Sequence, residues 1–198
     1  PRVAEPLGLL DCCPTTDGAA AVIVTRTDLA RRSGKPHVVI QGTGLSCASG
    51  YFTMAFDSDY DFLGFDSTRE AARAAYAQAG IDNPRERIDV AEVHDCFTIT
   101  EIVNYEDLGF CGRGEGGAFV EAGNIGPGGS LPVNTNGGGL SCVHPGMYGM
   151  FVTIEAVEQL RGQCGERQIE GANIALANGN GGVLSSQVTA IYGTEATL

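Results

Sequence analysis

Two stretches of the chain carry apolar residues at helical spacing. Between 148 and 161 apolar side chains recur every three or four positions, which predicts a helix that ends at Gly162. Its apolar positions are Phe151, Ile154, Val157 and Leu160. A second, shorter stretch around Ile99, Ile102 and Val103 predicts a helix that stops near Gly109.

Two helix starts carry the sequence signature of a capping box. Ser67 and Glu70 stand three residues apart ahead of an alanine-rich run that ends at Gly80. Thr98 and Glu101 repeat this spacing at the start of the helix around Ile102. In both places we expect the hydroxyl and the carboxylate to satisfy backbone N–H groups of the first turn.

Strand patterns fill the segments between the predicted helices. The run "HVVIQGTG" at 37–44 predicts a buried strand, and the alternation at 88–93 predicts a second strand. Near the C-terminus the pattern indicates a strand at 173–177, an Asn/Gly turn at 178–182 and a strand at 183–192. These last three segments together are typical of a hairpin.

The remaining segments are less regular. The small residues of 18–25 indicate a helix end or a strand, and 26–36 is polar enough for a connection. Residues 51–66 show no period, so we expect a loop. The glycine-rich stretch 112–139 interleaves apolar and Asn residues, which favours an ordered loop near a site over a flexible linker. The alternation of helices and strands predicts an α/β layered domain in which helices cover a mixed sheet.

Charge and composition exclude several function classes. The chain has 198 residues, a net charge of −12 and 43% hydrophobic residues, which is a typical soluble balance. Clustered Lys and Arg are needed to bind phosphate backbones, so we expect no nucleic-acid partner. No apolar run reaches the roughly 18 to 20 residues of a membrane span, and no signal peptide is visible, so we expect no membrane partner. Because the first residue is Pro, the chain is interpreted as a processed piece or a fragment.

The cysteines do not form a metal or redox motif. There are 7 cysteines, and no two of them stand in a C-x-x-C pair. The pattern favours buried reduced thiols in a cytoplasmic protein over a disulfide framework, and we expect no bound metal.

Two histidines are the leading candidates for chemistry. His144 follows a glycine run and precedes the helix that begins near Tyr148, where helix-end N–H groups favour a neutral imidazole base. His94 follows a predicted strand, at the edge where α/β sheets bind ligands, and can contact an oxyanion or a water. The alternatives are a loop-capping role for His144 and a His94 that is satisfied by Asp95 or by the backbone.

Four motifs appear in an order that resembles a known family. They are "TTDGAAAVIVT", "EVHDCF", "NTNGGGLSCVHPGMYG" and "ALANGNGG", and the match spans nearly all of the chain. The chain resembles the C-terminal half of a thiolase, in the branch that includes sterol carrier protein X and related bacterial thiolase-like proteins. The resemblance implies that residues 1–35 complete the first thiolase half. Residues 36–198 would then form the C-terminal domain of an αβαβα layered fold.

The resemblance also assigns roles. It implies a catalytic His144 and a nucleophilic cysteine in the first half, so neither Cys47 nor Cys142, which share the letters "GLSC", is the nucleophile. Asn178 stands where the family has a second, acid/base cysteine, and an amide can only orient and hydrogen-bond. Tyr148 is either an acid/base or a packing residue.

The catalytic set is thus His144, His94, Tyr148 and Asn178. Expected substrate contacts are Phe97, Gly146, Asn180 and Gly181.

Three functions stay open at this stage. The first is thiolysis of a 3-oxoacyl-CoA, with coenzyme A as co-substrate and no cofactor bound by this chain. The second is retro-aldol cleavage of a β-hydroxyacyl-CoA of the steroid side-chain type, and the third is a non-catalytic scaffolding half. The expected partners are the first thiolase half in the same or a separate chain, a second copy in a homodimer or higher oligomer, and a small zinc-ribbon/OB-fold acyl-CoA-binding protein.

Overall fold

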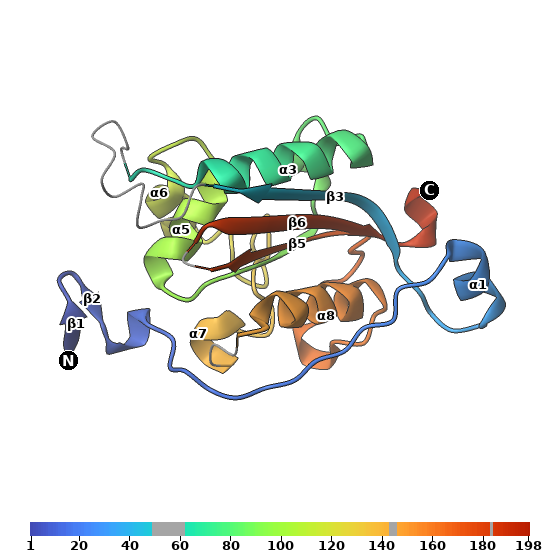
Figure 1. The fold of residues 1–198 in the computed structure, drawn as a ribbon, viewed down its shortest axis with the longest axis horizontal. Coiled ribbons are helices and arrows are strands. Elements are labelled where there is room, and N and C mark those ends of the chain that lie inside the picture. The colour runs from blue at the N-terminus through green and yellow to red at the C-terminus, as the bar shows by residue number, and fades with distance from the viewer. Residues whose placement is uncertain (49–61, 143–145, 183) are drawn as a thin grey trace.

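A mixed sheet with helices on both faces organises the chain (Figure 1). The structure is a computed structural model that describes residues 1–48, 62–142, 146–182 and 184–198. The 4-stranded sheet has the order β3-β6-β5-β4, in which β4 and β5 run parallel and the other neighbours run antiparallel. The strands are β3 (Val39–Cys47), β4 (Val90–Val93), β5 (Ile174–Gly181) and β6 (Ser186–Gly193). This arrangement confirms the α/β fold class expected from the sequence.

The helices divide between the two faces of the sheet. Helix α3 (Asp66–Ala79) and helix α5 (Thr98–Asp107) cover one face, where Ala72, Ala75, Tyr105 and Leu108 join the core. Helix α8 (Tyr148–Leu160) covers the other face, as Figure 1 shows. The shorter helical elements are α1 (Thr27–Arg32), α4 (Pro84–Arg87), α6 (Gly116–Glu121), α7 (Gly138–Cys142), η1 (Leu9–Asp11), η2 (Gly165–Arg167) and η3 (Glu195–Thr197). No helix among the described residues is long and apolar enough to cross a membrane.

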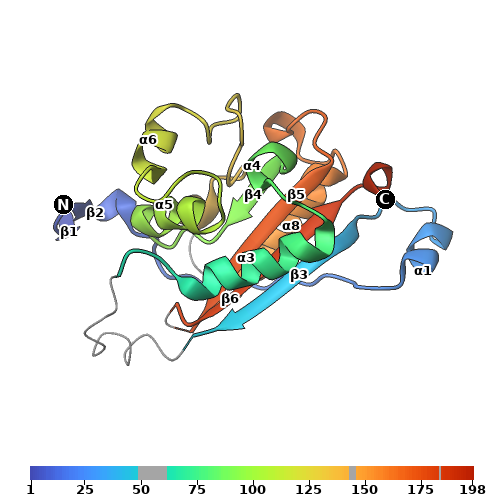
Figure 2. The same cartoon turned by 90° about the horizontal axis from the view of Figure 1, so that it is seen from above.

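The N-terminal arm, residues 1–36, runs along the outside of this layered body. It carries a small hairpin of β1 (Arg2–Ala4) and β2 (Leu7–Gly8) and then the helix α1. In Figures 1 and 2 the arm passes from the hairpin at one end of the molecule to α1 at the other. Residues 18–25, which were expected to form a helix end or a strand, form neither, and Ile23 is 94% exposed. Residues 27–32, which were expected to be a connection, form α1.

Both predicted capping boxes are wrong, although both helices are confirmed. Helix α3 already starts at Asp66, so Ser67 lies buried inside it, and Glu70 pairs with Arg73. At α5, the Thr98 hydroxyl donates to Asp11. The Glu101 carboxylate accepts from Asn134. At α3 the partner of Glu70 is local, whereas at α5 residues from distant parts of the chain bind the side chains that a local cap would have used.

The C-terminal hairpin is confirmed, but its turn lies later than predicted. Strand β5 continues through the expected turn at 178–182 as far as Gly181, which pairs with Ser186. The predicted strand at 37–44 is also confirmed as β3, yet it is an edge strand with exposed Ile40 and Leu45 rather than a buried one. Of the loop predicted at 51–66, residues 51–61 lie outside the described part of the chain.

Glycines let α3 lie directly on β3. A Cβ at Gly44 would stand 1.9 Å from the carbonyl oxygen of Ala71, and one at Gly42 would stand 2.2 Å from that of Ala75. Both neighbours are backbone atoms of a packed helix, which cannot move aside cheaply. The glycines of the sequence "QGTG" therefore set the distance between the helix and the sheet.

Gly44→Ala should destabilise the protein, at the upper end of the about 1–3 kcal/mol that overpacking a core costs. The melting temperature should fall by several degrees. Gly117→Ala is the matched control, because a Cβ there meets open space in an exposed helix. Equal melting temperatures for the two variants would contradict the close approach of α3 to β3.

Candidate active site

Residues 132–134 of the glycine-rich stretch pair with the outer edge of β4. The backbone N–H of Ala91 donates to the Pro132 carbonyl at 3.0 Å, and that of Asn134 donates to the Ala91 carbonyl at 2.9 Å. The Asn134 side chain accepts from the N–H of Val93 at 2.8 Å. Asn134 adopts a left-handed backbone with a φ of 48°, which Asn tolerates better than most residues. This segment is therefore an ordered part of the sheet edge, as the sequence predicted.

Asp95 continues this attachment beyond the end of β4. Its carboxylate accepts the N–H of Gly139 at 2.7 Å and that of Leu140 at 3.3 Å, at the start of α7. Burial raises the pKa of Asp95, and the hydrogen bonds from Gly139 and Leu140, together with a side-chain interaction with Tyr148, counteract this rise. Asp95 thus joins the end of β4, the start of α7 and the first residue of α8. The sequence pointed to Asp95 only as a partner of His94.

His94 and Tyr148 meet at the same end of the sheet. Their rings make an edge-to-face contact with centroids 5.3 Å apart, and both side chains are buried. The backbone of His94 is fixed by the Asn178 carbonyl, at 3.0 Å from the His94 N–H, and by the Asn104 side chain, at 2.8 Å from the His94 carbonyl. The structure therefore brings together two of the residues that the sequence singled out.

Glycines bring α8 close to this end of β5. A Cβ at Gly179 would stand 3.2 Å from the Cα of Gly149, so the first turn of α8 lies directly on the strand. This contact places the start of α8, including Tyr148, against the sheet. It gives a packing reason for the glycines in "MYG" and "ANG".

The other predicted site residues fall in different places. The side chain of Asn178 donates to Thr189 Oγ1 at 3.1 Å on the face covered by α3 and α5, whereas its neighbour Ala177 packs on the face of Tyr148. Asn180 shares the face of Asn178 by strand alternation. Phe97 is 40% exposed at the start of α5, and Gly146 is exposed. Gly181 ends β5.

The predicted base, His144, lies outside the described residues. In sequence it falls between Cys142, the last residue of α7, and Gly146. Cys47 is exposed at the end of β3, with its Sγ 3.5 Å from Ser186 Oγ. The roles predicted for His144 and Cys47 stay predictions.

A buried pair of carboxyl groups lies next to the site, and the sequence analysis missed it. Glu92 on β4 and Glu155 on α8 both approach the hydroxyl of Thr135, at 2.8 Å and 2.7 Å. The amide of Gln159 also donates to this hydroxyl, at 2.9 Å. The available signal was the carboxylate within the apolar strand "VAEV".

The hydrogen bonds around Thr135 determine which of Glu92 and Glu155 carries the charge. A hydroxyl has one proton, so Thr135 can donate to only one of the two carboxyl groups, and the other must itself donate. Arg167 donates to both oxygens of Glu155, at 2.8 Å and 3.0 Å, and lowers the pKa of Glu155 although burial opposes it. Among the residues that the structure describes, no cation pairs with Glu92, and burial raises its pKa to about 8. Glu92 is therefore the protonated partner at neutral pH.

The same neighbourhood contains acidic and thiol groups that resemble a metal-ligand set. Ligand atoms of Glu155, Glu158 and Cys164 lie within 4.8 Å of one another. However, the guanidinium of Arg167 already contacts Glu155 at 2.8 Å and Glu158 at 3.4 Å. A protein cation thus neutralises these carboxylates, and we assign no metal to them.

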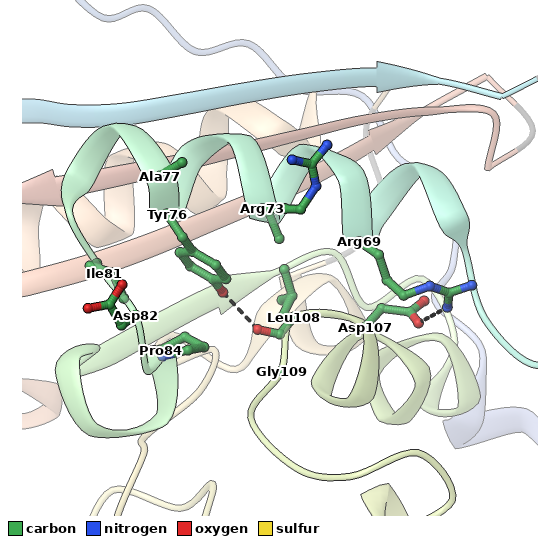
Figure 3. A pocket seen from close by; sticks show the side chains of 11 residues that line it. Arg69, Arg73, Tyr76, Ala77, Ile81, Asp82, Pro84, Asp107, Leu108 and Gly109 are labelled. Atoms are coloured by element: carbon green, nitrogen blue, oxygen red, sulfur yellow. Dashed lines mark hydrogen bonds and ion pairs between the residues drawn. The ribbon is translucent and has the colours of Figure 1, made fainter.

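A hollow beside α3, shown in Figure 3, is also structural. Arg69 pairs with Asp107 and Asp66, and Arg73 pairs with Glu70. The Tyr76 hydroxyl donates to the Leu108 carbonyl at 2.8 Å, which ties α3 to the end of α5. Arg69, Arg73 and Asp107 of this hollow are held in ion pairs, so we do not assign it chemistry.

Comparison with known proteins identifies the family. The model of the family described as "Thiolase C-terminal domain-like" matches residues 48–194, and the chain belongs to this family. It is 42% identical over 191 residues to an acetyl-CoA acetyltransferase of Methanothermobacter thermautotrophicus, covering 96% of this chain and 48% of that protein. It is 37% identical to sterol carrier protein 2 of Oryctolagus cuniculus, covering 94% of this chain and 34% of that protein.

A solved structure contains the same fold. The Ltp2-ChsH2(DUF35) aldolase superimposes with a TM-score of 0.85 at 32% identity, covering 98% of this chain and 49% of that chain. The chain thus spans half or less of the length of the proteins it matches. These likenesses confirm the resemblance to thiolases of the sterol carrier protein branch.

Glu92 should make the stability of the protein depend on pH. Its folded-state pKa of about 8 lies above the ordinary value of 4.5, so the folded state holds a proton that the unfolded state releases. The free energy of unfolding should therefore fall as the pH rises from 4.5 to 8, by up to about 1.4 kcal/mol per pH unit. Urea unfolding at pH 5, 6, 7 and 8 measures this slope.

Glu92→Gln keeps a neutral donor and acceptor, so the variant should lose this contribution to the slope and exceed the wild type in stability at pH 8. Glu158→Gln is the control, because Glu158 lies on the exposed side of Arg167. Identical slopes for wild type and Glu92→Gln would show that Glu92 is ionised in the folded protein.

Proposed function

We propose that this chain is the C-terminal half of an acyl-CoA thiolase that cleaves a 3-oxoacyl-CoA by thiolysis. The first half of the enzyme, in the same or a separate chain, supplies the nucleophilic cysteine, and coenzyme A is the co-substrate. The family membership and the retention of both histidines, His94 and His144, support this function. No cofactor is needed for this chemistry.

The reaction is covalent catalysis in two steps. His144 takes the proton of the first-half cysteine, whose sulfur attacks the ketone carbon of the substrate. The bond between that carbon and the α-carbon breaks, the α-carbon takes up the proton that His144 accepted, and the CoA ester that contains the α-carbon leaves. The thiol of coenzyme A then attacks the acyl-cysteine thioester and releases the second acyl-CoA. His94 stabilises the oxyanion that develops at the thioester carbonyl, directly or through a water.

The observation that carries the choice of thiolysis is the environment of Tyr148. Its ring is buried against His94, and its side chain interacts with the Asp95 carboxyl group. A phenol held in this way orients His94 and the start of α8. This supports a packing and positioning role for Tyr148 rather than proton transfer to a substrate. In this proposal Phe97, Gly146, Asn180 and Gly181 line the substrate site. Asn178 contributes from the face of the sheet covered by α3 and α5, where its amide donates to Thr189.

Retro-aldol cleavage of a β-hydroxyacyl-CoA is the second candidate. It is supported by the likeness to the Ltp2-ChsH2(DUF35) aldolase at a TM-score of 0.85 and by the absence of a cysteine at Asn178. In that reaction Tyr148 would exchange a proton with the substrate hydroxyl, so its phenol would be indispensable.

Variants of Tyr148 and His144 distinguish the two reactions. His144→Ala should lower kcat by about 10²–10⁴, because a positioned general base contributes that much. Tyr148→Phe keeps the ring against His94, so under thiolysis kcat should change by only a few-fold. Under aldol cleavage kcat should fall by about 10² or more. The measurement is steady-state turnover of 3-oxoacyl-CoA and β-hydroxyacyl-CoA by the assembled enzyme.

Asn178→Ala is the comparison for His144→Ala, because it removes an orienting amide and should cost less. A large loss in Tyr148→Phe with an unchanged melting temperature would favour the aldolase. Activity near wild type in His144→Ala would refute both reactions.

Uncovered apolar surface supports a partner for this chain. Helix α8 leaves part of its sheet face open, where Leu45 is 69% exposed and Val188 and Ile40 are also exposed. The arm adds Ile23 and Val24, and a cavity of about 990 Å³ lies between residues 21–40 and α8. We propose that the first thiolase half covers this surface and that residues 1–35 complete its sheet.

Further proposed contacts are a homodimer or higher oligomer in the cytoplasm and a small zinc-ribbon/OB-fold acyl-CoA-binding protein. The likeness to the Ltp2-ChsH2(DUF35) aldolase, whose name joins two components, supports a second protein.

Residues 1–198 expressed alone should aggregate or bind a hydrophobic dye, because apolar side chains at Ile23, Val24 and Leu45 would face water. Co-expression with the first half should remove dye binding and give a soluble complex in size-exclusion chromatography. A cooperative thermal melt of the isolated chain as a dye-free monomer would contradict the proposed partner.

A further inference from the structure

The N-terminal arm pairs with the strand end that carries His94 and Asp95. Cys12 and Phe97 form an isolated antiparallel bridge. Next to it, the backbone N–H of Cys13 donates to the carbonyl of Cys96 at 3.1 Å. The side chains of Thr98 and Asp11 add a hydrogen bond of 3.1 Å. These contacts hold residues 11–13 of the arm against residues 96–98.

This register places two cysteines opposite each other. In an antiparallel pair, one step from the bridge between Cys12 and Phe97 brings Cys13 opposite Cys96. Side chains at directly opposite positions point to the same side, and their Cα atoms lie about 4.5–5.5 Å apart. Disulfides span Cα separations of about 4.4–6.8 Å, so the backbone does not have to move far for a bond between them.

Two further observations support a bond between Cys13 and Cys96. Both side chains are half-buried rather than enclosed, so a small oxidant can reach them. Burial, followed by the proximity of Cys96, raises the pKa of Cys13, which indicates that the two sulfurs lie near each other. Cys12 alternates to the opposite side, where its thiol donates to the Gly8 carbonyl at 3.5 Å.

We propose that Cys13 and Cys96 form a reversible disulfide when the protein meets hydrogen peroxide, tying the N-terminal arm to the active-site edge of the sheet. The two thiols lose two protons and two electrons, a sulfur–sulfur bond forms, and one peroxide is reduced to two waters. The Cys96 side chain, directly after Asp95, is then locked to the arm. Oxidation would thus restrain the backbone next to Asp95 and change the geometry of the active site. The nucleophilic cysteine of the first half would take no part in this bond.

The sequence allows a direct test in the assembled protein. Trypsin cleavage at Arg2, Arg26, Arg87 and Arg113 yields peptides 3–26 and 88–113. In a Cys12→Ser, Cys111→Ser background each peptide keeps a single cysteine, Cys13 or Cys96. After peroxide treatment and alkylation, mass spectrometry should find these two peptides joined, and dithiothreitol should separate them.

The matched variant is Cys13→Ser in the same background, with Cys13→Ala as a second variant should the first fail to fold. Either should abolish the joined peptides. The proposal is overturned if no joined peptide forms at a peroxide concentration that oxidises the exposed Cys47. It is also overturned if Cys96 joins another cysteine or is oxidised only by itself.

Turnover gives an independent readout. Peroxide should lower the activity of the protein with Cys13 several-fold, with recovery in dithiothreitol, and the Cys13→Ser protein should be spared. Unchanged activity in a preparation shown to be cross-linked would overturn the effect on the site. Detection of the cross-link requires no turnover, so the bond can be found or refuted even if the proposed reaction is wrong.

Discussion

The free edge of β4 is the constraint on which the site depends. A buried edge strand cannot leave its N–H and carbonyl groups unpaired, and here the glycine-rich segment satisfies them. The pairing starts with Ala91 and Pro132, continues through Asn134, and ends where Asp95 accepts the N–H groups of Gly139 and Leu140. A stretch that lacks regular structure is thereby fixed to the strand that carries His94. The start of α8 follows it in sequence and is fixed through Tyr148.

Neutral and charged carboxyl groups share this region for a physical reason. Glu92 and Glu155 are both buried, and two negative charges around one hydroxyl would repel each other. Arg167 stabilises the charge on Glu155, so the proton stays on Glu92. The pair then forms a hydrogen-bonded link from β4 through Thr135 to α8. These hydrogen bonds hold Thr135, a few residues before α7, in place between β4 and α8.

The sheet face that α8 covers stays partly open in this chain, which spans half or less of the length of its relatives. Helix α8 covers β4 and β5, whereas Leu45 and Val188 at the β3 side remain exposed. Burying apolar area is the main driving force of association, so a surface of this kind is best satisfied by another folded unit. The arm around Ile23 likewise exposes apolar side chains to water. The fold is layered, and on this side the described residues leave the β3 end of the sheet uncovered.

The sequence by itself determined the three longest helices, the strands of the main sheet and the family. The helical spacing of 148–161 and the stops at Gly80 and Gly162 were read correctly, because these signals are local and both glycines adopt the left-handed backbone that such stops require. The order of motifs such as "EVHDCF" identified a thiolase half. It also directed attention to His94 and Tyr148, which the fold brings into contact.

Only the tertiary structure decided what each polar side chain does. Thr98 and Glu101 have the spacing to cap their own helix, but they form hydrogen bonds with Asp11 and Asn134. These partners lie far away in the sequence, so no local pattern could predict them. The face of Asn178 followed from the register between β5 and β6, and the turn shifted because pairing persisted to Gly181. The protonation of Glu92 required Thr135, Glu155 and Arg167 from distant parts of the chain. Sequence spacing describes neighbours along one element, whereas burial and pairing between elements set these contacts.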